Sequence, residues 1–240
     1  MVYQSAPWQA RQSLLIGEEG CGRLAGASIA VIGLGGVGGA AVEALARAGV
    51  GRLILMDHDQ ISLTNINRQL LATRETVGMQ KTEAAAARVK SINPGCQTEL
   101  LPVFYSPETA EALFSLEFGL LIDCIDTVTA KLDLAVQCKA RGIRELACLG
   151  TGNRLDPGAF RMGDISETAK AGGDGLARVM RRELRRRGIE KARVLYSTEP
   201  PRKTVIAEGG RYAPGSISVC PPAAGYLLAA DAISYFLARD

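Results

Sequence analysis

A glycine-rich turn between an apolar strand and a predicted helix constrains this chain more than any other feature. Residues 29–32 form a short run rich in β-branched side chains, and residues 40–48 have the composition of a helix. In this order of elements the turn ends at a helix N-terminus, where unpaired N–H groups and the helix dipole attract phosphate. The sequence therefore predicts a nucleotide-binding turn. Its glycines are Gly33, Gly35, Gly36 and Gly38.

The segment after this helix predicts how the nucleotide would be held. Residues 52–56 form a second apolar strand, and Asp57 follows it directly. A carboxylate about 20 residues beyond the glycines accepts hydrogen bonds from a ribose in this architecture. Taken alone, this pattern suggests a dehydrogenase. The polar residues that follow Asp57 argue against that interpretation, because a nicotinamide enzyme has no use for them.

Those polar residues form a set that suits a triphosphate under attack. Arg68 and Lys81 would neutralise charge on the β- and γ-phosphates, and Asn65 would orient an α-phosphate oxygen or a ribose hydroxyl. Asp126 follows the fourth predicted strand of the sheet, so we expect it to reach the same crevice and bind Mg²⁺. Asp59 and Gln69 complete the set, although either alone would equally suit a turn cap. Arg11 would add a further cation from another chain.

Composition excludes several classes of protein. The chain has 240 residues, 47% of them apolar, and a net charge of +3, so it can bury one full core and is not a polycation. Six scattered cysteines without a C-x-x-C pair predict the reduced thiols of a cytoplasmic protein. Because His58 is the only histidine, zinc and a Ser–His–Asp triad are both disfavoured, and we assign His58 no role.

Strands and helices alternate up to residue 153. Further strands are predicted at residues 98–103, 120–125 and 144–149, and helices at 78–89, 107–114 and 130–141. This alternation predicts an α/β fold with a Rossmann-like, doubly wound and mostly parallel sheet.

We expect a single domain over residues 1–240. It would comprise an N-terminal helical arm (1–27), an ATP-binding core (28–153), a substrate-facing insertion (154–215) and a C-terminal strand and helix (216–240). The apolar stretch 219–238 contains two prolines and Asp231, so it predicts a buried helix and no transmembrane segment.

The insertion contains a segment with a dense basic face. Apolar residues at helical spacing begin at Leu176 and predict an amphipathic helix. A solvated surface is one explanation for its charge, and an anionic partner such as RNA is the other. Six arginines within ten residues of a chain that is only +3 overall favour RNA. Its predicted contacts are Arg178, Arg181, Arg182, Arg185 and Arg186.

The motifs of the first two-thirds occur in a recognisable order. G-x-G-G-x-G, D-x-D, N-x-x-R-Q, a following lysine and D-C-I-D resemble the ubiquitin-activating-enzyme superfamily. The resemblance implies adenylation of a carboxylate with ATP and Mg²⁺, with release of pyrophosphate. It also implies a homodimer in which Arg11 reaches the site of the other chain. By the same resemblance Gly35, Gly36 and Asp57 hold the nucleotide, Asn65, Arg68 and Lys81 contact the phosphates, and Asp126 holds Mg²⁺.

The second half resembles one branch of that superfamily, the tRNA threonylcarbamoyladenosine dehydratases. The resemblance rests on D-T-V-T-A-K at 126–131, G-T-G-N-R-L-D-P at 150–157, the arginine-rich segment, and V-L-Y-S-T-E at 194–199. It implies an ATP-dependent cyclisation of the threonine carboxylate on a modified adenosine beside the tRNA anticodon. It leaves open a monovalent cation and a thioester at Cys220, for which a buried inert thiol is the alternative.

Two other functions stay open at this point. One is an adenylyltransferase for the C-terminal glycine of a ubiquitin-like sulfur carrier, although those enzymes usually carry two C-x-x-C pairs for zinc. The other is a non-catalytic nucleotide-binding adaptor that works with a cysteine desulfurase or a sulfur-acceptor protein. The basic segment favours the tRNA enzyme, and the intact Arg68 and Lys81 argue against the adaptor.

Overall fold

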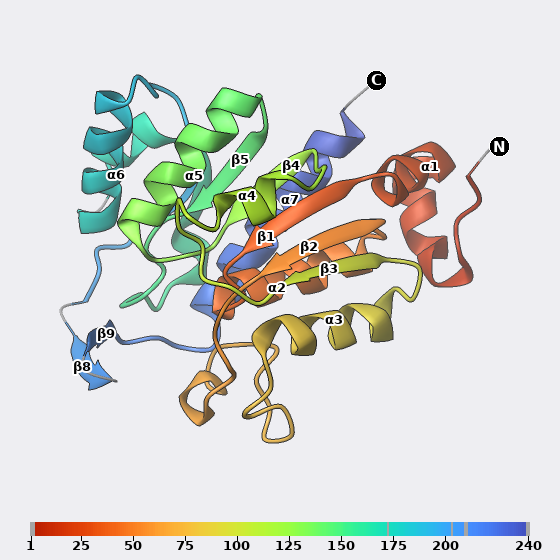
Figure 1. The fold of residues 1–240 in the computed structure, drawn as a ribbon, viewed down its shortest axis with the longest axis horizontal. Coiled ribbons are helices and arrows are strands. Elements are labelled where there is room, and N and C mark those ends of the chain that lie inside the picture. Colours follow the sequence, from red (N-terminus) through yellow and green to blue (C-terminus); the bar gives the residue numbers. More distant parts are fainter. Residues whose placement is uncertain (1–2, 172, 203, 209–210, 239–240) are drawn as a thin grey trace.

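The computed structural model describes residues 3–171, 173–202, 204–208 and 211–238, which contain one seven-stranded sheet and a separate β-hairpin (Figure 1). The sheet is formed by β1 (Ser28–Ile32), β2 (Arg52–Met56), β3 (Gln97–Leu101), β4 (Leu120–Asp123), β5 (Arg144–Cys148), β6 (Phe160–Asp164) and β7 (Arg193–Ser197). The hairpin is formed by β8 (Val205–Glu208) and β9 (Arg211–Pro214).

The strand order is β3-β2-β1-β4-β5-β7-β6, and every neighbouring pair is parallel except β6 with β7. The chain moves outward from β1 through β2 to β3 and then returns to β4 on the other side of β1. Strand order therefore reverses between β1 and β4, where a doubly wound sheet places its ligand crevice. The predicted doubly wound, mostly parallel α/β fold is confirmed.

Helices cover both faces of the sheet. They are α1 (Ala10–Ala25), α2 (Gly36–Arg47), α3 (Lys81–Ile92), α4 (Ala110–Phe114), α5 (Val128–Arg141), α6 (Gly175–Arg186) and α7 (Cys220–Leu237). One buried cluster joins α2, α3 and α7 to the sheet, and two further clusters join α4, α5 and α6 to its other face. In Figure 1, α4 and α5 lie in front of the sheet and α7 behind it.

The turn after β1 is tighter than the sequence predicted. Gly33 has a φ of +87°, a conformation that favours glycine. A Cβ atom at Gly38 would collide with the carbonyl oxygen of Gly33. Because α2 begins at Gly36, well before the predicted start at residue 40, Gly36 and Gly38 lie in its first turn, and the glycine turn itself is short.

The division of the second half differs from the prediction. Residues 154–215 contribute β6 and β7 to the main sheet, so this segment is partly an extension of the core. The strand expected within 216–240 is absent from the described residues, where the chain passes directly into α7. Pro214, Pro221 and Pro222 flank this junction and lack the N–H groups that a strand would donate.

The apolar C-terminal segment forms a helix, as predicted. Helix α7 packs so closely on α2 that a Cβ atom at Gly225 would collide with the carbonyl oxygen of Val37. Within the part of the chain that the structure describes, no helix is both long enough and apolar enough to cross a membrane.

One acidic side chain on β5, Glu145, is partly buried with an unpaired carboxylate oxygen. Atom Oε1 of Glu145 is inaccessible to solvent and lacks a hydrogen-bond partner among the described residues. Burial, with a smaller contribution from the Asp123 carboxylate, raises the pKa of Glu145 to about 8. Between the unfolded pKa of about 4.3 and this value, the folded protein binds a proton that the unfolded chain does not, so Glu145 reduces stability as pH rises.

Replacing Glu145 with Gln should therefore stabilise the protein by an amount that grows between about pH 4.3 and pH 8. At pH 8 we expect a gain of at least about 1 kcal/mol, because one pKa unit corresponds to 1.36 kcal/mol, and a Tm about 2–4 °C higher. Thermal unfolding of both proteins across this pH range measures the effect. Glu83→Gln, at an exposed position on α3, is the control, and an equal gain at every pH for Glu145→Gln would contradict the prediction.

Candidate nucleotide-binding and catalytic site

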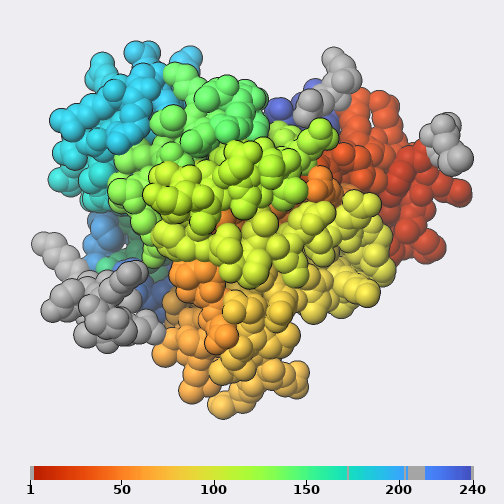
Figure 2. Space-filling view, viewed as in Figure 1, coloured from red at the N-terminus to blue at the C-terminus, as the bar shows by residue number. Residues whose placement is uncertain are grey.

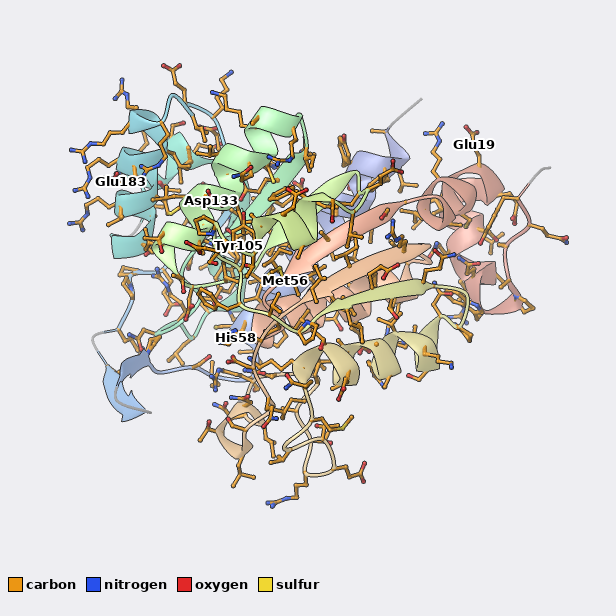
Figure 3. All side chains as sticks on the ribbon, viewed as in Figure 1. Glu19, Met56, His58, Tyr105, Asp133 and Glu183 are labelled. Carbon is orange, nitrogen blue, oxygen red and sulfur yellow. The ribbon has the colours of Figure 1, made fainter. Side chains whose placement is uncertain are left out.

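A cavity of about 970 Å³ opens where β1, β2, β4 and β5 end. Residues that follow each of these strands line it, as the topology requires of neighbouring parallel strands. Figure 3 shows this end of β2, with His58 beyond Met56 at the edge of the sheet. The cavity is large enough for a nucleotide together with a second ligand.

Most of the residues that the sequence singled out meet in this cavity. Its wall includes Gly33, Gly35, Gly36, Asp57, Asp59, Asn65, Arg68, Gln69, Lys81 and Asp126. Three predicted residues are not part of this wall. Gly38 lies in α2 behind the turn, Cys220 is fully buried at the start of α7, and Arg11 lies on α1.

Lys81 and two aspartates form the charged centre of the cavity. Lys81 is 6% exposed, and its Nζ lies 2.6 Å from Asp59 Oδ2 and 3.5 Å from Asp57 Oδ2. Asp57 also joins the glycine turn to β2, because its Oδ2 accepts a 2.6 Å hydrogen bond from the Leu34 N–H. Burial would raise the pKa of Asp59, but the hydrogen bond and charge of Lys81 outweigh it and lower this pKa.

The segment after β2 supplies the polar side chains opposite the glycine turn. Arg68 Nη1 donates to the Thr64 carbonyl oxygen at 3.0 Å and to Asn67 Oδ1 at 2.9 Å, which holds the guanidinium at the cavity wall. Asn65 Oδ1 accepts from the Ser62 N–H at 3.1 Å. Gln69 is 7% exposed, and its Oε1 lacks a partner among the described residues. A ligand donor in the cavity would satisfy that oxygen.

Asp126 lies on the turn between β4 and α5 and is exposed to the cavity. Within the described residues its side chain accepts only a weak 3.5 Å hydrogen bond, from Thr127 Oγ1, so its carboxylate retains most of its capacity as an acceptor. Mg²⁺ takes one or two carboxylates together with phosphate oxygens and water. An open carboxylate beside a phosphate-binding turn fits that requirement.

The far half of the cavity was missed by the sequence analysis. Its wall is formed by residues 148–152, Leu176 and residues 214–216, which come from the end of β5, the start of α6 and the segment before α7. Glycines at 150 and 152 after a predicted strand are the one local signal for this wall. The other segments are distant in sequence, and only the folded chain brings them together.

His58, to which we assigned no role, is also part of the wall. Its ring makes an edge contact with Phe104 at 5.0 Å between centroids, and its Nε2 lies 3.1 Å from Asp59 Oδ1. Phe104 is 45% exposed and lines the cavity directly after β3. An exposed aromatic residue at a strand end was the available signal for this apolar surface.

Arg11 lies at the opposite end of the sheet from the cavity. The neighbouring Gln12 donates from Nε2 to the carbonyl oxygen of Ala48, just beyond the C-terminal end of α2. The same part of α1 exposes Leu14 and Leu15, which are 88% and 85% exposed. Arg11 therefore cannot reach the cavity of its own chain.

Cys220 is a poor candidate nucleophile in this structure. The side chain is fully buried beneath the cavity wall, and burial raises the pKa of its thiol. A thiolate is the reactive form of cysteine, so both properties reduce its reactivity.

Helix α6 presents the predicted arginines as one basic surface. Arg178, Arg181, Arg182, Arg185 and Arg186 line a groove of about 590 Å³. Figure 2 shows the outer surface of α6 (cyan) as an exposed ridge, and Figure 3 shows long side chains projecting from it around Glu183. Glu183 pairs with Arg182, Arg186 and Arg187.

The arginines of this groove differ in whether their side chains form hydrogen bonds or ion pairs within the protein. Arg181 donates to Thr168 Oγ1 at 2.7 Å. The exposed side chains of Arg178 and Arg185 form no hydrogen bond or ion pair with the other described residues, so their charges face solvent. The predicted amphipathic helix is confirmed, and its basic face is available to an anion.

Comparison with known proteins gives a consistent result. The ThiF family model matches residues 9–239. A tRNA threonylcarbamoyladenosine dehydratase of Bacillus subtilis (strain 168) is 38% identical over 231 residues, which cover 91% of this chain and 90% of that protein. The crystal structure of E. coli tRNA N6-threonylcarbamoyladenosine dehydratase in complex with ATP is similar with a TM-score of 0.86, 31% identity, and coverage of 98% of this chain and 96% of that chain. The complex of that enzyme with AMP gives a TM-score of 0.87, 31% identity, and coverage of 99% and 98%.

Replacing Lys81 with Met should weaken nucleotide binding at the cavity. The change removes a buried cation and leaves Asp57 and Asp59, whose ligand atoms lie within 4.8 Å, to repel a triphosphate. We expect the Kd for ATP to rise at least about tenfold, or ~1.4 kcal/mol, in titration calorimetry. Lys90→Met, at an exposed position near the end of α3, is the matched control. An unchanged Kd for Lys81→Met would exclude Lys81 from the phosphate site.

Proposed function

The chain belongs to the ThiF family, and on that premise we propose that it catalyses the ATP-dependent dehydration of N6-threonylcarbamoyladenosine in tRNA. The reaction closes a ring between the threonine carboxyl carbon and the ureido group of the modified nucleoside. ATP supplies the driving force by activating the carboxylate. This activity agrees with both resemblances of the sequence and with the geometry of the cavity.

One observation supports this function above others: the start of α6 contributes residues to both the cavity and the basic groove. Leu176 lines the far half of the cavity, and Arg178 lines the groove two residues later. A tRNA backbone held by α6 would therefore bring one of its nucleosides to the far half of the cavity. The glycine turn would hold ATP in the other half.

The chemistry requires a better leaving group on the carboxyl carbon. A carboxylate oxygen of the threonyl group attacks the α-phosphorus of ATP, and pyrophosphate leaves. The ureido group then attacks the acyl carbon and loses a proton, and AMP leaves with the former carboxylate oxygen, so the nucleoside loses one water overall. Ring closure is intramolecular and depends mainly on positioning, which is consistent with a cavity whose one histidine lies at its edge.

The residues of the near half have roles that follow from charge and position. The N-terminus of α2 and the glycine turn would bind phosphate, and Lys81 and Arg68 would stabilise the charge that develops on it. Asp57 and Asp59 would accept hydrogen bonds from the ribose. Asp126 would hold Mg²⁺, which neutralises phosphate charge when bound.

The alternatives find less support. The dehydratase relatives align over nearly the whole chain, including the segment that carries the basic helix. That helix has no evident use in an adenylyltransferase for a ubiquitin-like protein. A cysteine desulfurase or sulfur acceptor is not part of the proposal, because dehydration of the nucleoside transfers no sulfur.

The decisive experiment measures the product directly. The protein is incubated with ATP, Mg²⁺ and tRNA that carries threonylcarbamoyladenosine, and the digested nucleosides are analysed by mass spectrometry. We expect an ATP-dependent loss of the mass of one water, with AMP and pyrophosphate formed in equal amounts.

Arg68→Ala and Asp126→Ala should each abolish the reaction without loss of folding, because both side chains lie at the cavity wall outside the core. A nucleoside of unchanged mass, with pyrophosphate exchange stimulated by a ubiquitin-like protein, would refute the proposal.

The double variant Arg178→Gln/Arg185→Gln should bind tRNA more weakly, because both side chains line the groove and have no partner in the part of the chain that the structure describes. Loss of two phosphate contacts should reduce the slope of log K against log salt concentration by about 1.5. Binding measured between low and moderate salt tests this expectation. Arg187→Gln is the control, since Arg187 is paired with Glu183 and lies outside the groove. An unaltered slope in the double variant would make the groove a solvated surface only.

We also propose that the protein works as a homodimer. Arg11 lies far from the cavity of its own chain, and the exposed Leu14 and Leu15 beside it suit burial against another protein surface. A second copy with two-fold symmetry would bring Arg11 to the triphosphate of its partner, which agrees with the role implied by the sequence.

Mixing two inactive variants tests this arrangement. Arg11→Ala and Asp126→Ala should each be inactive as homodimers, but subunit exchange between them should restore activity at about one quarter of the sites. Half of the dimers are then mixed, and each mixed dimer has one site with both residues intact. Dehydration is measured before and after exchange. Activity that stays at background after exchange would place Arg11 outside the site.

A further inference from the structure

A fully buried ion pair lies beneath the turn that carries Asp126. Asp123 ends β4, and Lys131 lies in the first turn of α5. Both side chains are 0% exposed, and Lys131 Nζ lies 2.8 Å from Asp123 Oδ2. Neither residue lines the cavity, so neither contacts a ligand there.

The pair holds both sides of Ile125. Asp123 Oδ1 accepts a 3.1 Å hydrogen bond from the Ile125 N–H, and Lys131 Nζ donates a 3.0 Å hydrogen bond to the Ile125 carbonyl oxygen. That carbonyl belongs to the peptide unit that joins Ile125 to Asp126. The two side chains therefore orient the peptide planes directly before the Asp126 side chain, and α5 holds the chain directly after it.

The same turn also contacts the phosphate-binding turn. A Cβ atom at Gly33 would lie 3.0 Å from both Ile125 Cγ2 and the carbonyl group of Cys124. A shift of Ile125 would thus displace groups on both sides of the crevice, the glycine turn on one side and Asp126 on the other.

Stability alone does not account for such a pair. Two charges lose their hydration when they are fully buried, and apolar side chains of similar volume often give an equally stable protein. Burial would lower the pKa of Lys131, but the Asp123 carboxylate outweighs it and raises this pKa, so the lysine keeps its charge and its donors. Unlike apolar side chains, the pair provides an acceptor for the Ile125 N–H and a donor to the Ile125 carbonyl oxygen.

We propose that Asp123 and Lys131 are positioning residues that act through Asp126. They fix the Ile125 backbone and thereby hold the Asp126 carboxylate in the cavity wall, where it would bind Mg²⁺. This inference rests on the proposed function of the cavity. It assigns a functional role to two residues that touch neither nucleotide nor tRNA.

The test replaces both charges at once, because removing one partner alone would leave an uncompensated buried charge and endanger the fold. In Asp123→Asn/Lys131→Met the asparagine still accepts from the Ile125 N–H, but the donor to the Ile125 carbonyl is lost. We expect kcat to fall by about 10–100-fold, the range for loss of groups that orient metal ligands. Affinity for ATP in the presence of EDTA should stay within about twofold, while the gain in affinity on adding Mg²⁺ should fall by about tenfold.

A double-mutant cycle separates positioning from a merely structural role. The cycle compares Asp126→Ala with the triple variant Asp123→Asn/Asp126→Ala/Lys131→Met. If the pair acts through Asp126, the gain in ATP affinity on adding Mg²⁺ should be the same in both variants. Additive losses in the triple variant would overturn the inference. Full activity and a normal Mg²⁺ response in the folded double variant would also overturn it.

Two further variants complete the design. Glu43→Gln/Arg88→Met removes an ion pair between a buried carboxylate and a half-exposed arginine, with 2.7 Å between Glu43 Oε2 and Arg88 Nε, away from the cavity wall. It should leave the Mg²⁺ response unchanged, and an equal loss of that response would show that the effect is not specific to Asp126.

If the first double variant does not fold, Asp123→Asn/Lys131→Gln retains an amide donor and is subject to the same cycle. Failure of the proposed reaction would appear separately, as wild-type protein that binds Mg²⁺ and ATP but removes no water from the nucleoside.

Discussion

The crevice of this protein depends on two neighbouring parallel strands that end at the same edge while their helices go to opposite faces. Strands β1 and β4 are hydrogen-bonded neighbours, and α2 and α5 leave them toward different sides of the sheet. The turns after these strands therefore face each other across a gap that side chains of the core do not fill. The backbone of the glycine turn and the Asp126 carboxylate of the other turn meet only because of this divergence.

Charge in and around the crevice is organised in layers. Lys81, Asp57 and Asp59 lie in the wall with their ion pairs partly open to the cavity, and Arg68 adds a further cation. Asp123 and Lys131 lie below and are closed to solvent. The outer layer is the basic surface of α6, where free arginines suit a polyanion. A small-molecule anion, a fixed peptide turn and a nucleic acid thus each have a matching environment within one α/β domain.

Residues close together in sequence were predicted well because their signal is local. The glycine turn and Asp57 belong to the β1–α2–β2 unit, whose geometry is nearly the same wherever it occurs, and the cluster from Asn65 to Lys81 lies in the next connection, between β2 and α3. The observed ends of some elements differ from the predicted ends by a few residues. The start of α2 is an example, because its N-cap residue, Gly35, has no side chain to mark it. The role of residues 154–215 in the sheet was predicted poorly, since an edge strand that pairs antiparallel with a later strand has no distinctive local pattern.

By itself the sequence determined the alternation of strands and helices, the glycine turn, the basic helix and the family, because each depends on residue type and short spacing. Only the tertiary structure decided which distant segments share the cavity: residues 148–152, Leu176 and residues 214–216 come from three separate elements. It alone placed Arg11 away from its own cavity and buried Asp123 with Lys131 under Asp126. Such contacts join residues whose separation along the chain carries no information about their distance in space, and packing of the whole core sets that distance.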